Sequence, residues 1–173
     1  EVLDKKPELN FRDLHWRYMT QWNIANVYGS KRDFAKAREA TNKCIEQGKK
    51  YGMPSSYVHM PLNQLLGQYM SETDYKGAEA FILANPNIET VYKNHDYESL
   101  FYAYKATILE KMGRPDSVEY YLKQSVITGE KTQVGSAAGA HNRYGSFLLK
   151  TGAVKDAIKQ FELARSEERR VGK

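Results

Sequence analysis

The sequence predicts an all-α fold, an α-solenoid of about four antiparallel helix pairs. One pattern of residues recurs four times along the 173-residue chain, anchored at Tyr28, Tyr69, Leu109 and Leu148, which are 41, 40 and 39 residues apart. Within each recurrence, apolar residues fall three and four positions apart, as on one face of an amphipathic helix. No stretch alternates apolar and polar residues over the length of a strand. A repeat of helical segments at nearly constant spacing is typical of stacked helix pairs.

Mostly small or apolar residues occupy the same offsets around each anchor. Three residues before the anchors stand Ala25, Leu66, Ala106 and Gly145. Nine residues after the anchors stand Ala37, Ala78, Val118 and Ala157, and seven further on stand Cys44, Asn85, Ser125 and Ala164. Helix axes approach to about 8–10 Å only when the side chains at the contact are small. We therefore expect these positions to lie where the helices of each pair cross.

A polar turn ending in aspartate separates the two halves of each unit. The four aspartates are Asp33, Asp74, Asp116 and Asp156. An aspartate at a helix start accepts hydrogen bonds from free backbone N–H groups and is stabilised by the positive end of the helix dipole. Each turn is therefore predicted to join a first helix to a second helix. The first helices are expected to end near Gly29, Met70, Met112 and Lys150.

The four predicted units span residues 8–51, 55–86, 96–131 and 134–164. In the second unit Pro61 leaves two alternatives: a helix that begins at Met60 with proline in its first turn, or a longer, kinked helix from Ser55. Residues 85–96 are predicted as a long connection and residues 134–139 as a tight one. Residues 1–7 are expected to be the stub of a preceding unit or a linker.

The order of residues in each unit resembles the tetratricopeptide repeat, W-x2-L-G-x2-Y…A-x3-F…P. The last unit matches best, through Gly145, Leu148, Ala157, Phe161 and Ala164. The resemblance covers roughly residues 16–164 and departs from the pattern in its period, about 40 residues rather than 34. It implies a right-handed array whose first helices line a concave groove.

The resemblance also implies which side chains face that groove. They lie three before and one after each small crossing residue, or next to those positions. The candidates are Trp22, Asn23, Asn26, Asn63, Gln64, Tyr104, Thr107, Asn142, Arg143 and Ser146. Side-chain amides both donate and accept hydrogen bonds, so a ladder of them can hold an extended peptide, with Trp22 as an apolar anchor. The alternative is that these residues merely solvate the concave face. Arg143 is the one cation among them, which argues against the lysine and arginine cluster that grips C-terminal carboxylates in some members.

Candidate catalytic, metal and cofactor residues are sparse, and none is predicted to act. Cys44 is the single cysteine, so it forms no internal disulfide, and its repeat position favours packing over nucleophilic chemistry. The four histidines are scattered, no two of them lie three or four residues apart, and His141 is expected to be a surface or partly buried residue. The glycines near residue 135 match neither the G-x-G-x-x-G motif nor the P-loop, so they indicate no nucleotide-binding site. The chain is therefore predicted to be no enzyme.

The charge pattern weakly suggests nucleic acid. Lys36, Lys43 and Lys50 are seven residues apart and share one helix face, which could track phosphates. Asp33, Glu39 and Glu46 interrupt that stretch, which favours a solvated outer face. The chain carries a net charge of +5, and residues 165–173 hold four of its cations and two of its carboxylates, leaving +3 elsewhere. The longest apolar run, residues 80–84, is far too short to cross a membrane.

Residues 165–173 resemble the read-through of a common sequencing adapter, and we predict a tail that is not native to the fold. The function predicted from the rest is a non-catalytic scaffold that binds a peptide or protein segment in the groove. The long period resembles the repeat regions of bacterial sensor kinases and transcription regulators. The alternatives are the docking arm of an enzyme whose catalytic domain lies outside this sequence, or a basic nucleic-acid surface. Compartment, oligomeric state and partner identity are not indicated.

Overall fold

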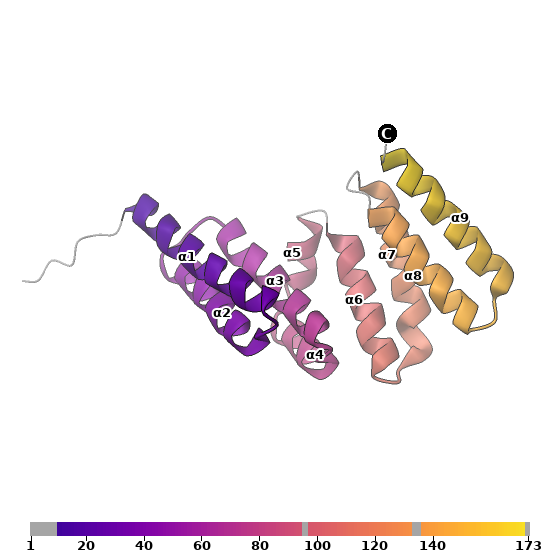
Figure 1. The fold of residues 1–173 in the computed structure, drawn as a ribbon, viewed down its shortest axis with the longest axis horizontal. Coiled ribbons are helices and arrows are strands. Elements are labelled where there is room, and N and C mark those ends of the chain that lie inside the picture. The colour runs from indigo at the N-terminus through magenta and orange to yellow at the C-terminus, as the bar shows by residue number, and fades with distance from the viewer. Residues whose placement is uncertain (1–9, 95–96, 133–135, 172–173) are drawn as a thin grey trace, which may run out of the picture. The chain divides into compact units, whose positions relative to one another are not determined.

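A computed structural model describes residues 10–94, 97–132 and 136–171, and these form helices and short turns with no strand among them. The chain divides into two compact units, Glu1–Asp74 and Tyr75–Lys173. The prediction of an all-α fold is confirmed for the described residues, whose helices pack in adjacent pairs (Figure 1).

The first unit contains three helices, α1 (Phe11–Ser30), α2 (Phe34–Lys50) and α3 (Ser56–Glu72). Asn10 caps α1, because its side-chain oxygen accepts a hydrogen bond from the backbone N–H of Asp13 at 3.0 Å. Helix α2 packs against both α1 and α3. A small core cluster of Tyr18, Cys44 and Met53 fills the space beside these contacts. Helix α2 therefore contacts both α1 and α3, and it sets the distance between them.

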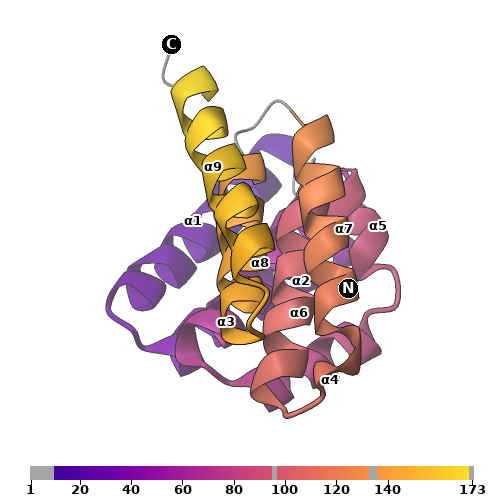
Figure 2. The ribbon, with the colours of Figure 1, turned by 90° about the vertical axis from the view of Figure 1, so that its right-hand side faces the viewer.

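The second unit holds the remaining helices. They are α4 (Tyr75–Ala84), α5 (Ile88–Lys93), α6 (Glu98–Lys111), the 3-10 turn η1 (Pro115–Ser117), α7 (Val118–Lys131), α8 (Ser136–Lys150) and α9 (Val154–Val171). Helix α6 packs on α7, α7 on α8 and α8 on α9, and Figures 1 and 2 both show α8 beside α9. Helix α6 also contacts α8, so the first helices of two successive pairs meet. That contact places the faces of α6 and α8 next to one another.

The same backbone turn ends each first helix. The residue four positions after each anchor has a positive φ: Arg32 (60°), Thr73 (62°), Gly113 (72°) and Gly152 (84°). The N–H of the next residue then donates to the carbonyl oxygen of the anchor itself, at 2.9, 3.0, 2.9 and 2.9 Å in chain order. This is the Schellman arrangement, which satisfies carbonyl groups left free at a helix end. The sequence repeat is therefore also a repeat of turn geometry.

The crossing positions predicted from the repeat are buried. Exposure is 0–1% at Ala25, Leu66 and Ala106 and at all four second-helix positions from Ala37 to Ala157. At Gly145 there is room for no side chain, since an added Cβ would lie 2.8 Å from the Phe161 ring. Asn85 departs from the set, because it is only half-buried and its amide donates to the Phe81 carbonyl oxygen at 2.8 Å. The small residues thus allow close contact of the helices.

Several sequence predictions need correction. The connection predicted at residues 85–96 contains the extra helix α5, so the described residues hold nine α-helices rather than about eight. Asp33 does cap α2 through the N–H of Lys36, at 3.3 Å. Asp116 instead lies in η1, and Asp156 lies inside the first turn of α9. Both aspartates favour the helix start by charge without capping it.

The first residues of α3 and α8 decide two further sequence predictions. Helix α3 begins at Ser56, so Pro61 lies inside it and the helix from Met60 is wrong. The tight connection predicted at residues 134–139 is wrong from residue 136 onward, since α8 begins at Ser136, and residues 134–135 lie outside the described residues. Residues 1–7, predicted as a stub, lie outside the described residues. Helix α9 extends into the predicted tail as far as Val171, and the last residue described as buried is Ala164.

Candidate functional site

The ten predicted groove residues lie on the first helices of the pairs. Those on α1 and α3 belong to the first unit and those on α6 and α8 to the second. Five of them line a hollow in the surface: Trp22 in the first unit, and Thr107, Asn142, Arg143 and Ser146 in the second. Each unit therefore has its own candidate site on its first helices.

The hollow in the first unit lies between α1 and α3, has a volume of about 260 Å³, and is mainly aromatic. Its lining residues are His15, Tyr18, Met19, Trp22, Ser56, Tyr57 and Met60. The Tyr18 and Trp22 rings are nearly parallel, with centroids 6.2 Å apart, and Tyr57 meets Tyr18 edge to face at 4.7 Å. A hydrogen bond of 2.6 Å joins Tyr57 Oη to His15 Nδ1 and holds the two helices together. We name this hollow the aromatic pocket.

The polar groups of the aromatic pocket include hydroxyl groups and the His15 imidazole. Burial raises the pKa of the Tyr18 phenol, and nearby Cys44 and Tyr57 raise it further. The pocket lining contains no carboxylate, lysine or arginine. Apolar area and ring faces therefore dominate what this pocket offers to a ligand.

Part of the expected amide ladder is used within the protein. Gln64 Nε2 donates to Asn26 Oδ1 at 2.6 Å, which joins α3 to α1. The Gln64 Oε1 atom is buried and accepts no hydrogen bond from the described residues. Asn23 is exposed and Asn63 is half-buried, and neither lines the aromatic pocket. Two of the expected ladder residues, Asn26 and Gln64, are therefore hydrogen-bonded to one another.

The hollow in the second unit lies between α6 and α8, has a volume of about 290 Å³, and is more polar. Its lining residues are Ala106, Thr107, Glu110, Val118, Leu122, Asn142, Arg143, Ser146, Phe147 and Lys150. We name it the polar groove. Lys150 Nζ lies 2.8 Å from Glu110 Oε1, so the one carboxylate in the lining is already paired. The Thr107 and Ser146 hydroxyls donate to carbonyl oxygens of their own helices, at 2.9 and 2.8 Å, and remain able to accept.

Arg143 is a charged residue of the polar groove that has no ion-pair partner among the described residues. It is exposed, and among the described residues it has no hydrogen bond or ion pair. Its positive charge lowers the pKa of the Tyr104 phenol, although burial of that ring has the larger effect and raises the pKa overall. Tyr104 is half-buried and lies outside the groove lining. Arg143 can therefore accept an anionic or carbonyl partner from outside the fold.

Most residues that line the aromatic pocket were not among the candidates predicted from the sequence. His15, Met19 and Trp22 follow each other at spacings of four and three residues, so helical periodicity alone could have placed them on one face of α1. Tyr57 and Met60 reach the pocket from α3, across the packing of α2. No local pattern marks that contact.

The basic face of α2 is largely neutralised by its own carboxylates. Lys36 Nζ lies 2.9 Å from Asp33, and Lys43 Nζ lies 2.7 Å from Glu39. These hydrogen bonds raise the pKa of each lysine and lower the pKa of each carboxyl group. Arg38 pairs with Glu72 of α3. A phosphate backbone would have to compete with these pairs.

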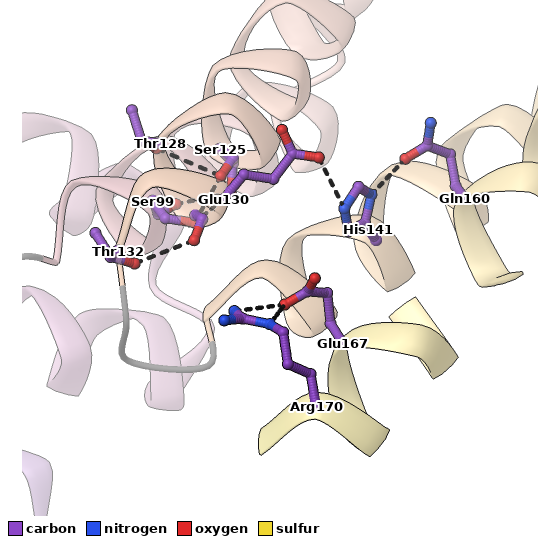
Figure 3. Close-up of polar contacts among 10 residues, drawn as sticks. Ser99, Ser125, Thr128, Glu130, Thr132, His141, Gln160, Glu167 and Arg170 are labelled. Atoms are coloured by element: carbon purple, nitrogen blue, oxygen red, sulfur yellow. Dashed lines mark hydrogen bonds and ion pairs between the residues drawn. The ribbon is translucent and has the colours of Figure 1, made fainter. Parts of the chain in front are cut away.

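His141 is buried, at 1% exposure, which corrects the expected surface or partly buried position. Figure 3 shows its ring between two neighbours, with Nδ1 2.7 Å from Gln160 Oε1 of α9 and Nε2 3.3 Å from Glu130 Oε1 of α7. Beside it, Ser99 and Ser125 exchange hydrogen bonds with each other's backbone carbonyls, at 2.7 and 2.8 Å. These contacts tie α6, α7, α8 and α9 together, and we interpret them as structural.

Among the described residues, no three side chains from histidine, cysteine, aspartate and glutamate are arranged to hold a metal ion. The same residues include no helix that is both long and apolar enough to cross a membrane. Cys44 is fully buried, and burial raises the pKa of its thiol to about 11. A neutral, enclosed thiol is a poor nucleophile.

Comparison with known proteins finds no family model that matches this chain and no curated protein similar to it. The tetratricopeptide resemblance therefore rests on the residues quoted for it.

Proposed function

We propose that this chain is a non-catalytic scaffold of the tetratricopeptide type that holds a peptide or protein segment against its first helices. The observation that carries the proposal is the pair of hollows on those helices, one in each unit, lined by five of the side chains named from the repeat. A surface that merely solvates the fold needs no concave aromatic lining, whereas peptide anchors bind in such pockets.

The two hollows suit different chemical groups of a bound segment. The aromatic pocket offers ring faces and thioethers to an apolar side chain. The polar groove offers the Asn142 amide, the Arg143 guanidinium and hydroxyl oxygens to backbone and polar groups. A right-handed array of about four units is the finer form of the proposed fold. Nucleic acid is the weaker alternative, since two of the three lysines that suggested it, Lys36 and Lys43, are paired with Asp33 and Glu39.

The test begins with peptides selected from a displayed random library on the purified chain. A selected peptide is then titrated by calorimetry against Trp22→Ala, Arg143→Ala and a double variant, Lys36→Ala with Lys43→Ala. We expect Trp22→Ala or Arg143→Ala to weaken peptide binding by roughly tenfold or more, and the double lysine variant to bind normally. The proposal fails if no library peptide binds, or if only the lysine variant loses affinity.

A further inference from the structure

We propose that the aromatic pocket receives a large apolar side chain of an acidic segment, with the flanking carboxylates facing Arg12. This inference rests on the proposed function and names the chemistry of the partner. The lining of the pocket indicates an apolar side chain, and the charge along α1 indicates acidic residues on either side of it.

The pocket is shaped for a bulky side chain rather than for a backbone. It combines three aromatic rings from two helices with the thioethers of Met19 and Met60. Met60 is 51% exposed, so part of this apolar lining faces solvent in the free protein. Covering it with a phenylalanine-sized group removes apolar area from water on both partners.

The charge beside the pocket is positive. Arg12 precedes His15 by three residues and Met19 by seven, which places all three on one face of α1. Arg12 is exposed and has no hydrogen bond or ion pair with any described residue, and the Nε2 atom of His15 is likewise without a partner there. Helix α3 carries no charged residue from Ser56 until Glu72, which pairs with Arg38. Within the part of the chain that the structure describes, this face of α1 therefore presents a cation that is not paired with an anion.

This charge pattern separates two possible occupants. Aromatic boxes also bind cations, such as quaternary ammonium groups, over their ring faces. Such sites gain from nearby carboxylates, and the pocket lining contains none while Arg12 lies one turn away along α1. The polar groove repeats the pattern, since Arg143 is unpaired and Glu110 is held by Lys150. An acidic segment matches both units, whereas a cationic ligand is repelled.

The two tryptophans allow a direct measurement. Trp16 is 61% exposed, so Trp16→Phe leaves Trp22, inside the pocket, as the sole reporter of tryptophan emission. The probes are short capped peptides on a glycine-serine backbone: phenylalanine flanked by glutamates, the same peptide with alanine for phenylalanine, and the same peptide with lysines for glutamates. Tetramethylammonium chloride is the cation probe.

We expect the glutamate-phenylalanine peptide to change Trp22 emission saturably and to bind about thirtyfold more tightly than its alanine version. Lysine flanks weaken binding about tenfold at low salt, and Arg12→Glu reverses the preference between glutamate and lysine peptides. Met60→Glu, a change at an exposed position, abolishes binding without unfolding the chain. Arg143→Gln, in the other unit, leaves this titration unchanged.

The inference is overturned if no probe peptide changes the emission, if alanine and phenylalanine peptides bind equally, if the flanking charge has no effect, or if tetramethylammonium binds instead. The proposed function is tested separately by the library peptides. If those peptides bind and depend on Arg143 but are indifferent to Trp22, Met60 and Arg12, the scaffold proposal stands and this inference is wrong.

Discussion

At the scale of single residues, burial decides what Cys44 can do. Its side chain is enclosed by α1 and α2, and Sγ lies 3.9 Å from the Tyr18 carbonyl oxygen, a weak contact that stabilises the neutral thiol. Loss of solvent raises its pKa to about 11, which leaves almost no thiolate at neutral pH. The residue therefore acts as a small apolar group in the core.

This gives a prediction about thiol labelling. At pH 8, a disulfide reagent such as DTNB should label native Cys44 at least about a hundredfold more slowly than the chain unfolded in guanidinium chloride, because both access and thiolate are lacking. Because the pKa is higher in the folded state, the thiol stabilises the fold fully below about pH 8.5, the unfolded pKa, and that contribution is lost as pH rises through about 11. Equal labelling rates in native and unfolded chain would contradict the buried position.

His141 shows what residue patterns could not reveal. A lone histidine beside Asn142 and Arg143 favours a surface or partly buried position, yet its ring is buried. Its partners, Glu130 and Gln160, come from the helices on either side, and one lies against each ring nitrogen. Polar residue type alone does not indicate burial when the hydrogen-bond partners lie 11 and 19 residues away.

At the scale of elements, the four turns have one geometry but different residues at the left-handed position. Glycine occupies it in the third and fourth turns, whereas Thr73 has φ 62° in the second. A β-branched residue is strained there, by roughly 1–2 kcal/mol. Thr73→Gly should raise the free energy of unfolding by about 0.5–1 kcal/mol, the strain relieved less the entropy that glycine adds to the unfolded chain. The matched change, Gly113→Thr, should lower it by about 1–2 kcal/mol.

Chemical denaturation of both variants measures these shifts. If Thr73→Gly destabilises the chain and Gly113→Thr does not, the four turns are not equivalent, and the repeat of turn geometry is wrong.

The crossing of α8 and α9 depends on a missing side chain. A Cβ at Gly145 would approach the Phe161 ring to 2.8 Å, so Gly145→Ala should lower the free energy of unfolding by about 1–2 kcal/mol despite the better helix propensity of alanine. Gly29 in α1 is the control, because a Cβ there meets nothing within 4 Å. Gly29→Ala should stabilise the chain by up to about 1 kcal/mol. Thermal melts that rank the two variants in the reverse order would contradict the packing described for Gly145.

The end of α9 should matter little to stability. Beyond Ala164 the described side chains are exposed, apart from half-buried Glu167, and the Glu167 to Arg170 pair is local to the helix. Deleting residues 165–173 should therefore shift the free energy of unfolding by no more than about 0.5 kcal/mol. A markedly lower melting temperature would show that the tail belongs to the fold.

The elements were predictable where a long pattern marked them. The spacing of Tyr28, Tyr69, Leu109 and Leu148 predicts all four turns. Helix α5 was missed because its apolar residues, Ile88, Val91 and Tyr92, span barely more than one turn. Too few residues lie in such a segment for periodicity to separate a helix from a connection.

At the scale of the whole molecule, the repeat indicates which helices carry the binding face, but packing decides what that face contains. Trp22 could be named from the sequence, whereas the edge-to-face contact of Tyr18 with Tyr57 exists only because α2 holds α1 and α3 at that distance. The two units, each with its own hollow, are therefore best treated as two candidate binding elements on one chain.

A cross-linking map tests most directly whether a peptide binds against the first helices of the pairs. A library-selected peptide carrying a photoreactive diazirine leucine is irradiated in complex with the chain, and the attachment sites are read by mass spectrometry. The account predicts sites on α1 and α3, on α6 and α8, or on both sets, concentrated around the aromatic pocket and the polar groove. Attachment mainly to α2, α7 or α9 would contradict it, because binding would then occur away from the first helices.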